Sequence, residues 1–183
     1  MVKAAIIGCG KIAQVRHIPE YLEHQAVNLV GFYDLNEKRA EELAEKYGGK
    51  AYGSVEELLA DPQIDAVSIC TANPTHAELT IKALKAGKHV LCEKPMAITL
   101  EECQRMVECA EENHRKLLIG QNQRLTRTHQ IARKLIADGE IGNVLSFQTS
   151  FQHSGPESWS VDAGKNTWFF QKKAAAMGVM GDL

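Results

Sequence analysis

V-K-A-A-I-I-G-C-G-K-I-A, residues 2–13, is the stretch of this sequence that decides its fold. Apolar residues lead into a G-x-G-x-x-A pattern, which predicts a buried strand, a tight turn and the start of a helix. Gly8 permits the turn, Gly10 leaves room for a phosphate beside the backbone, and Ala13 lets the helix pack closely on the strand. The helix N-terminus adds free N–H groups and a positive dipole end. We therefore expect a dinucleotide to bind here, with a plain structural turn as the alternative. The expected cofactor-binding residues are Gly8, Cys9, Gly10, Lys11 and Ile12.

Composition and charge narrow the class of protein. Apolar residues make up 44% of the 183 residues and charged residues 24%, which are ordinary values for a globular protein. The net charge of −2 and the lack of a basic block argue against nucleic acid as a partner. No apolar run is long enough to cross a membrane, and the chain enters its first strand without a signal peptide, so we expect no membrane association.

The cysteines and histidines carry further expectations. The five cysteines form an odd set without a C-x-x-C pair, which favours reduced thiols in a cytoplasmic protein over a disulfide framework. The seven histidines are scattered, so we expect no metal site. His17 and His89 are expected to be structural. His76 follows a predicted helix N-terminus, so we expect it to be neutral and either structural or next to the cofactor.

Asp34 bears on the choice of cofactor. It ends the second predicted strand, residues 27–34. A carboxylate at this place can accept hydrogen bonds from the adenosine ribose and would repel a 2′-phosphate, so the sequence favours NAD over NADP. Lys38 and Arg39 lie close by in the sequence and keep NADP open. The alternative role for Asp34 is that of a turn or helix-capping residue.

Strand and helix patterns alternate through the first 122 residues, with further strands expected near 50–52, 64–70, 89–93 and 117–122. Three of the helix starts have predicted caps, which are the capping boxes of Ser54 with Glu57 and of Thr99 with Glu102, and Asn73 as an N-cap before Pro74. This alternation demands right-handed crossovers and a parallel sheet covered on both faces. We therefore predict an α/β fold, a doubly wound Rossmann domain over residues 1–122. Ligands of such sheets bind at the carboxyl ends of the strands, where Gly8, Asp34, Thr71 and Lys94 are all expected.

The remainder, residues 123–183, has a different pattern. One helix is expected over 125–138, and residues 143–153 alternate like a strand that is half-buried on one side. One helix and one strand cannot bury their own apolar faces. We therefore expect an incomplete α+β second domain, and an exposed strand that favours a homo-oligomer.

Glu93-Lys94-Pro95 is the second informative stretch. A lysine at the carboxyl end of a parallel strand, beside a bound nicotinamide, can hydrogen-bond a substrate oxygen, stabilise negative charge there or pass a proton. The alternative is a solvated lysine in a turn before Pro95.

Together these motifs resemble a known family. G-C-G-K-I-A at 8–13, Asp34, T-A-N-P-T-H at 71–76 and E-K-P at 93–95 are similar to the glucose–fructose oxidoreductase / inositol dehydrogenase (Gfo/Idh/MocA) family. The resemblance implies an NAD(P)-dependent oxidoreductase that transfers a hydride between the nicotinamide and a sugar or polyol hydroxyl. It assigns Lys94 to the reacting hydroxyl and implies a cis bond before Pro95. It further implies cofactor contacts from Thr71, Asn73, His76, Glu93, Lys94 and Gln121.

The end of the sequence departs from the family pattern. The family has a glycine-rich run, an aspartate beside the lysine, and then a histidine that acts as acid and base. Here Asp182 matches the aspartate, and Leu183 follows it as the last residue. The resemblance therefore implies a truncated chain with cofactor binding but impaired catalysis, in which Asp182 is a second catalytic candidate. A non-catalytic module that binds or senses a dinucleotide is the alternative.

Overall fold

The computed structural model describes residues 1–152, 155–161, 168–171 and 175. Six parallel strands form one sheet in the order β3-β2-β1-β4-β5-β6. The strands are β1 (Val2–Ile7), β2 (Val27–Tyr33), β3 (Lys50–Ala51), β4 (Ala66–Ile69), β5 (His89–Cys92) and β6 (Leu117–Ile119). The helices are the π-helical η1 (Ala13–His17), α1 (Ile18–Glu23), α2 (Glu37–Tyr47), α3 (Val55–Ala60), α4 (His76–Lys85), α5 (Leu100–Glu112) and α6 (Arg127–Ala137). Short 3-10 helices are η2 (Asn73–Thr75), η3 (Asn122–Leu125), η4 (Pro156–Trp159) and η5 (Trp168–Phe170). The predicted doubly wound α/β fold is confirmed.

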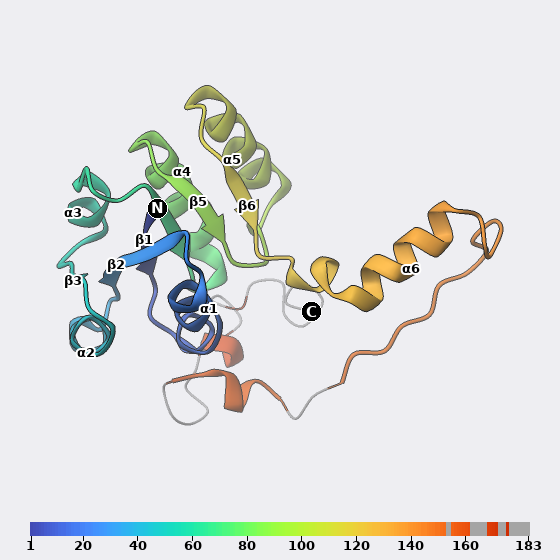
Figure 1. Ribbon diagram of the computed structural model, residues 1–183, viewed down its shortest axis with the longest axis horizontal. Coiled ribbons are helices and arrows are strands. Elements are labelled where there is room, and N and C mark those ends of the chain that lie inside the picture. The colour runs from blue at the N-terminus through green and yellow to red at the C-terminus, as the bar shows by residue number, and fades with distance from the viewer. Residues whose placement is uncertain (153–154, 162–167, 172–174, 176–183) are drawn as a thin grey trace.

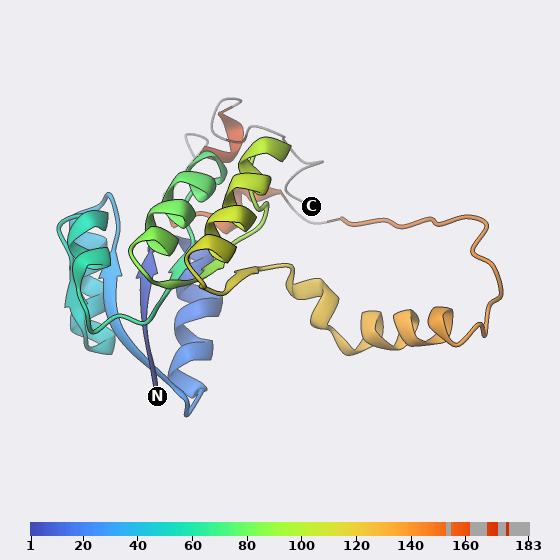
Figure 2. The same cartoon turned by 90° about the horizontal axis from the view of Figure 1, so that it is seen from above.

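Helices cover both faces of the sheet (Figures 1 and 2). On one face, α3, α4 and α5 pack on side chains such as Ile7, Val67 and Val90. On the other face, α1 and α2 pack on Ile6 and Phe32. Neighbours along one strand thus point to opposite cores, which explains why the central strands read as continuous apolar runs. Across the described ranges, no helix is both long and apolar enough to span a membrane.

Caps fix several helix starts. Thr99 and Glu102 form the predicted capping box of α5, with both reciprocal bonds present. The box predicted for α3 is only half formed. The Ser54 hydroxyl accepts from the Glu57 N–H, but the Glu57 carboxylate accepts from the N–H of Gly53 instead of Ser54. The ion pair of that carboxylate with Lys50, at 2.7 Å, also holds it on the β3 side.

The expectation that Asn73 caps helix α4 is wrong. The chain enters α4 through the 3-10 turn η2, so that Asn73 lies inside the turn and α4 begins at His76. Thr75 is the N-cap residue and makes no side-chain cap. Asn73 itself is 3% exposed.

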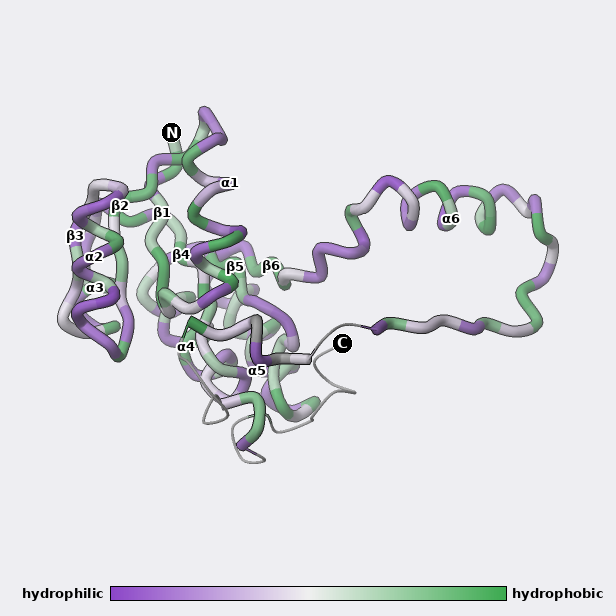
Figure 3. Tube along the Cα trace, turned by 90° about the horizontal axis from the view of Figure 1, so that it is seen from below, coloured by the Kyte–Doolittle hydropathy of each residue, from purple (hydrophilic) through white to green (hydrophobic). Residues whose placement is uncertain are grey.

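The strand expected over residues 143–153 is also not formed. Residues 144–152 have no regular secondary structure, and residue 153 lies outside the described part. A strand needs a partner for its backbone groups, and none of the described strands pairs with this segment. Helix α6 projects away from the sheet, and the chain returns from it as an extended trace (Figure 1). Apolar and polar residues alternate along α6 (Figure 3), and its described residues are exposed.

Candidate functional site

The predicted site residues lie along one edge of the sheet, where its parallel strands end. Gly8 follows β1, Asp34 follows β2, Thr71 comes shortly after β4, and Lys94 comes shortly after β5. Backbone hydrogen bonds continue past the strand ends and hold these segments side by side. The N–H of Gly8 donates to Tyr33 at 2.8 Å, that of Cys70 to Ile7 at 2.8 Å, and that of Glu93 to Ile69 at 2.9 Å. The sheet thus brings together residues that are far apart in sequence.

The two glycines of the first turn play different parts. Gly8 has φ +93°, and a Cβ there would lie 2.8 Å from the carbonyl carbon and oxygen of Cys70. Gly8 is therefore required by the protein itself. A Cβ on Gly10 would have no atom within 4 Å, so the space beside this backbone is open. Helical residues follow directly from Lys11 to Glu23, and the first N–H groups of a helix have no partner within it. The turn therefore fits a phosphate-binding role.

Asp34 is held by the protein on both carboxylate oxygens. Oδ2 accepts from the N–H of Cys9 at 2.7 Å, and Oδ1 accepts from the N–H of Asn36 at 2.8 Å. Arg39 Nη1 lies 3.3 Å from Oδ1. Asp34 therefore stabilises the turn after β2, which is the alternative role considered for it from the sequence. A carboxylate offers about four lone-pair directions, so acceptor capacity remains for a ribose hydroxyl.

Cys9, also predicted to contact the cofactor, is fully buried. Burial first, and then the neighbouring Asp34 carboxylate, raise the pKa of its thiol to about 12. The side chain therefore stays a neutral thiol at physiological pH, and the part of Cys9 that can face a ligand is its backbone. Its N–H is already engaged by Asp34, so the nearby N–H groups of Lys11 and Ile12 are the more available donors.

His76 connects the segment after β4 to the segment after β5. Its Nδ1 lies 2.7 Å from the carbonyl oxygen of Pro95, and its Nε2 lies 3.0 Å from that of Thr71. The side chain is fully buried, so His76 is structural and also adjacent to the predicted site. Asn73, another residue of this segment that is expected to contact the cofactor, is also buried.

Lys94 is half-buried and precedes a cis bond to Pro95, as expected. The neighbouring Glu93 carboxylate contacts His17, with Oε1 2.7 Å from Nε2, and accepts from the Lys94 N–H at 3.2 Å through Oε2. Burial is the largest influence on Glu93 and raises its pKa, but the hydrogen bond and charge of His17, together with Lys94, outweigh it. The pKa of Glu93 therefore lies below its ordinary value, and the carboxylate is ionised.

His17 has a closer relation to the site than the sequence indicated. It was expected to be an ordinary structural histidine, yet it contacts Glu93, the residue before Lys94. Ser68 and Tyr21 continue the contact behind it. One feature of the sequence could have indicated this contact. Ser68 is a polar residue inside the apolar strand β4, and the alternation of side chains along the strand places it on the same face of the sheet as α1.

Three predictions remain, which concern Gln121, Asp182 and metal binding. Gln121 follows β6 and is exposed, with its backbone N–H donating to Ile119. Asp182 lies outside the described residues. In the part of the chain that the structure covers, no three His, Cys, Asp or Glu side chains gather in an arrangement that could hold a metal ion.

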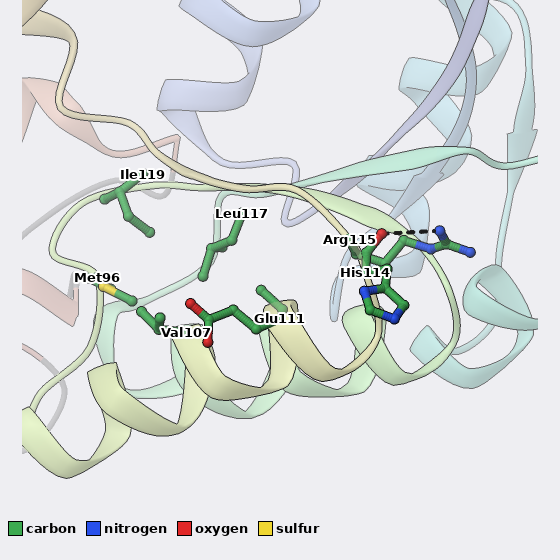
Figure 4. Close-up of a pocket in the computed structure, with 8 residues that line it drawn as sticks. Met96, Val107, Glu111, His114, Arg115, Leu117 and Ile119 are labelled. Atoms are coloured by element: carbon green, nitrogen blue, oxygen red, sulfur yellow. Dashed lines mark hydrogen bonds between the residues drawn. The ribbon is translucent and has the colours of Figure 1, made fainter.

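A hollow of about 600 Å³ lies over the outer edge of the sheet, between β6 and α5 (Figure 4). None of the predicted site residues lines it, so it is distinct from the predicted cofactor site. Its walls are formed by Met96, Val107, Ala110, Glu111, His114, Arg115, Leu117 and Ile119.

Comparison with known proteins gives two family matches. Residues 2–121 match the model of an oxidoreductase family with an NAD-binding Rossmann fold, GFO/IDH/MocA. Residues 129–183 match the model of the GFO/IDH/MocA C-terminal domain.

Individual relatives are also similar. The chain is 35% identical over its whole length to glucose-6-phosphate 3-dehydrogenase of Bacillus subtilis and covers 51% of that protein. It is 35% identical to myo-inositol 2-dehydrogenase of Thermotoga maritima, over 77% of this chain and 42% of that one. A 3-ketoreductase from Actinomadura kijaniata, in complex with NADP, superposes with a TM-score of 0.71 and 27% identity, over 75% of this chain and 42% of that chain. The chain thus spans about half the length of the curated relatives it matches.

Proposed function

The chain belongs to the GFO/IDH/MocA oxidoreductase family, and from that membership we propose that it binds a nicotinamide dinucleotide for hydride transfer to or from a sugar or polyol hydroxyl. The observation that carries the proposal is the row of residues along one sheet edge, from Asp34 through Gly8 and Thr71 to Lys94. A dinucleotide lies across such an edge, with its phosphates at the glycine turn. The open backbone at Gly10 supports this placement.

Each residue near the nicotinamide end of the site has its own proposed role. A bound nicotinamide dinucleotide would supply or accept the hydride. Lys94 would hydrogen-bond the reacting oxygen and stabilise the negative charge that develops there as the hydroxyl proton leaves. The ionised Glu93 would accept a hydrogen bond from a ribose hydroxyl at the nicotinamide end. Asp182 is proposed, from the family resemblance, as a second catalytic group beside Lys94.

We propose NAD rather than NADP as the preferred cofactor. Asp34 places a buried carboxylate at the end of β2, where a 2′-phosphate would meet its negative charge. Arg39 at 3.3 Å weakens this discrimination, because its guanidinium can also receive a phosphate. The relative from Actinomadura kijaniata, by contrast, is in complex with NADP.

We also propose that residues 1–122 are the dinucleotide-binding domain and that residues 123–183 belong to a substrate and oligomerisation domain. Support comes from the separate family matches to the two parts. The sheet is complete at β6, and α6 lies apart from it (Figure 2).

Cofactor binding and turnover test the proposal in two steps. NADH fluorescence is titrated with the full chain first, and a lack of binding overturns the proposal. Sugars and polyols are then offered with NAD, and NADH formation is followed by absorbance. Binding without turnover of any of them favours the dinucleotide-sensing module instead.

Where turnover is found, Lys94→Ala should lose most of it while keeping its NADH affinity. Lys85→Ala, at the exposed C-terminal end of α4, is the matched control and should change neither. Equal turnover in the two variants would remove the role assigned to Lys94.

A further inference from the structure

A buried row of hydrogen bonds runs behind the Lys94 segment, and the function proposed above uses only its last member, Glu93. His17 Nε2 lies 2.7 Å from Glu93 Oε1, and His17 Nδ1 lies 3.3 Å from Ser68 Oγ. The Tyr21 hydroxyl lies 2.5 Å from Ser68 Oγ. His17 and Ser68 are buried, and Tyr21 is partly buried. The row therefore joins the residue before Lys94 to helix α1.

The donors and acceptors of this row can be arranged in a single direction. The Tyr21 hydroxyl donates to Ser68, the Ser68 hydroxyl donates to Nδ1 of His17, and Nε2–H of His17 donates to Glu93. In this arrangement the Tyr21 hydroxyl, the Ser68 hydroxyl and the His17 ring each donate one hydrogen bond. Ser68 and His17 each also accept one. The row ends on an ionised carboxylate, and a hydrogen bond to an ionised acceptor is about twice as strong as one between neutral groups. The contact between His17 and Glu93 is therefore its strongest link.

The helix that carries His17 has an unusual local winding. Residues Ala13–His17 are π-helical, and the N–H of Ile18 donates to the carbonyl of Ala13, five residues earlier. Such segments are rare and occur frequently at functional sites. Here the wide turn places two consecutive residues, His17 and Ile18, on the buried side. Pro19 follows and lacks an N–H, so the helix gives up one regular hydrogen bond at the same place.

Gly120 and Lys94 also border the Glu93 carboxylate. A Cβ on Gly120 would lie 3.3 Å from both carboxylate oxygens, so the absence of a side chain there leaves the room that Glu93 occupies. Oε1 faces His17, while Oε2 accepts from the Lys94 N–H. A shift of the carboxylate would therefore change the hydrogen bond that holds the backbone N–H of Lys94.

We propose that His17 is a positioning residue, which fixes the Glu93 carboxylate and through it the backbone of Lys94 at the nicotinamide end of the site. The importance of Lys94 rests on the proposed function, whereas the hydrogen-bonded row is a property of the fold. His17 acts through Glu93 and not on the reacting atoms. The lowered pKa of Glu93, to which His17 contributes more than Lys94 does, agrees with this contact.

The row itself is tested without a ligand, by NMR of the full chain labelled with ¹⁵N in its histidine rings. Removing one hydroxyl, by Ser68→Ala or Tyr21→Phe, should shift the His17 ring signals. His89 is the internal reference, because its Nδ1 accepts from Lys116 at the opposite end of β5 and should not respond. If Ser68→Ala leaves the His17 signals unchanged, the row does not exist and the proposal falls.

The positioning role is tested by NADH affinity. His17→Leu removes the donor to Glu93 and should weaken binding about tenfold, the scale of one hydrogen bond to a charged group. His17→Gln keeps an N–H donor on a side chain of similar reach and should stay within about threefold of the wild type. Where turnover is measurable, His17→Leu should lower kcat as well as raise KM.

A thermal melt of each variant shows whether it is folded. If His17→Leu does not fold, Tyr21→Phe takes its place, with a smaller loss of affinity expected. Equal NADH affinity for the wild type and a folded His17→Leu variant would overturn the positioning role. If the wild type itself does not bind NADH, the proposed function fails, while the NMR comparison still decides whether the row is present.

Discussion

The ring of His76 lies between two loops, with its Nδ1 2.7 Å from the carbonyl oxygen of Pro95. Its other nitrogen faces the carbonyl oxygen of Thr71 at 3.0 Å. A carbonyl oxygen only accepts, so a neutral ring donates to one of the two and a protonated ring donates to both. His76 is thus in contact with both the segment after β4 and the segment that carries Lys94.

Replacing His76 should therefore lower stability markedly. His76→Ala leaves a cavity and removes the donor from buried carbonyl groups, so we expect the free energy of unfolding to fall by about 3 kcal/mol. Denaturant unfolding of the full chain measures this. His24→Ala, at an exposed position after α1, is the control and should cost less than about 0.5 kcal/mol. Similar losses in the two variants would contradict the structural role of His76.

The two glycines of the first turn should separate fold from binding. Gly8→Ala places a Cβ 2.8 Å from the Cys70 backbone at a φ of +93°, so we expect a loss of about 3 kcal/mol or more in stability. Gly10→Ala meets no atom within 4 Å, so its melting temperature should stay close to that of the wild type. Its NADH affinity should nevertheless fall, because the added methyl group occupies the space beside the turn. A Gly10→Ala variant with normal affinity would show that the phosphates lie elsewhere.

The parts of the fold that depend on local pattern were predictable. The glycine turn, the capping box of Thr99 and Glu102, and the alternation of strands and helices each have a signature of a few residues. The placing of Gly8, Asp34, Thr71 and Lys94 on one edge followed from the rule that parallel strands end together.

What could not be predicted depends on partners distant in the chain. The contact of His17 with Glu93 joins residues that are 76 positions apart in the chain, and no local pattern encodes it. The strand expected over 143–153 has the right alternation, but a strand forms only against a partner, and none of the described strands supplies one. The expectation for Asn73 failed because Pro74 is also compatible with a 3-10 turn, which delays α4 until His76.

Asp34 and Arg39 should set the balance between the two dinucleotides. Asp34→Asn keeps the shape and removes the charge, so we expect NADPH to gain about tenfold in affinity relative to NADH. Arg39→Ala should act in the opposite direction, because it removes a cation that lies 3.3 Å from the Asp34 carboxylate. Fluorescence titrations with both reduced cofactors give the ratio. An unchanged ratio in Asp34→Asn would mean that the ribose does not reach this carboxylate.

The ionisation of Glu93 should make the free energy of unfolding depend on pH. Its pKa in the folded protein lies below the ordinary value of 4.5, so the unfolded chain binds this proton more readily. The stabilisation is therefore complete above 4.5 and is lost as the pH falls through the folded-state pKa. Glu93→Gln should be less stable than the wild type at neutral pH, and the difference should shrink in acid. Denaturant unfolding over a pH series measures this, with the exposed Glu23→Gln as the control. A difference that is constant with pH would show that the charge of Glu93 contributes nothing.

The extended segment after α6 should drive self-association. Leu145 and Phe147 are 94% and 85% exposed, and α6 adds Ile131 and Leu135, which are also exposed. Large exposed apolar side chains favour association, and an unpaired extended backbone favours pairing with another copy. We therefore expect the full chain to associate with increasing concentration in sedimentation experiments.

Two substitutions at matched exposed positions test where that association arises. Phe147→Asp should shift the equilibrium toward the monomer, because burying the new carboxylate between two copies is costly. Leu100→Asp places the same charge at an exposed position in the first turn of α5, away from this segment, where an acid suits the helix dipole. It should associate like the wild type. If both variants shift the equilibrium equally, net charge rather than the segment after α6 controls the assembly, and if the wild type is monomeric at every concentration, the proposed homo-oligomer is wrong for this chain.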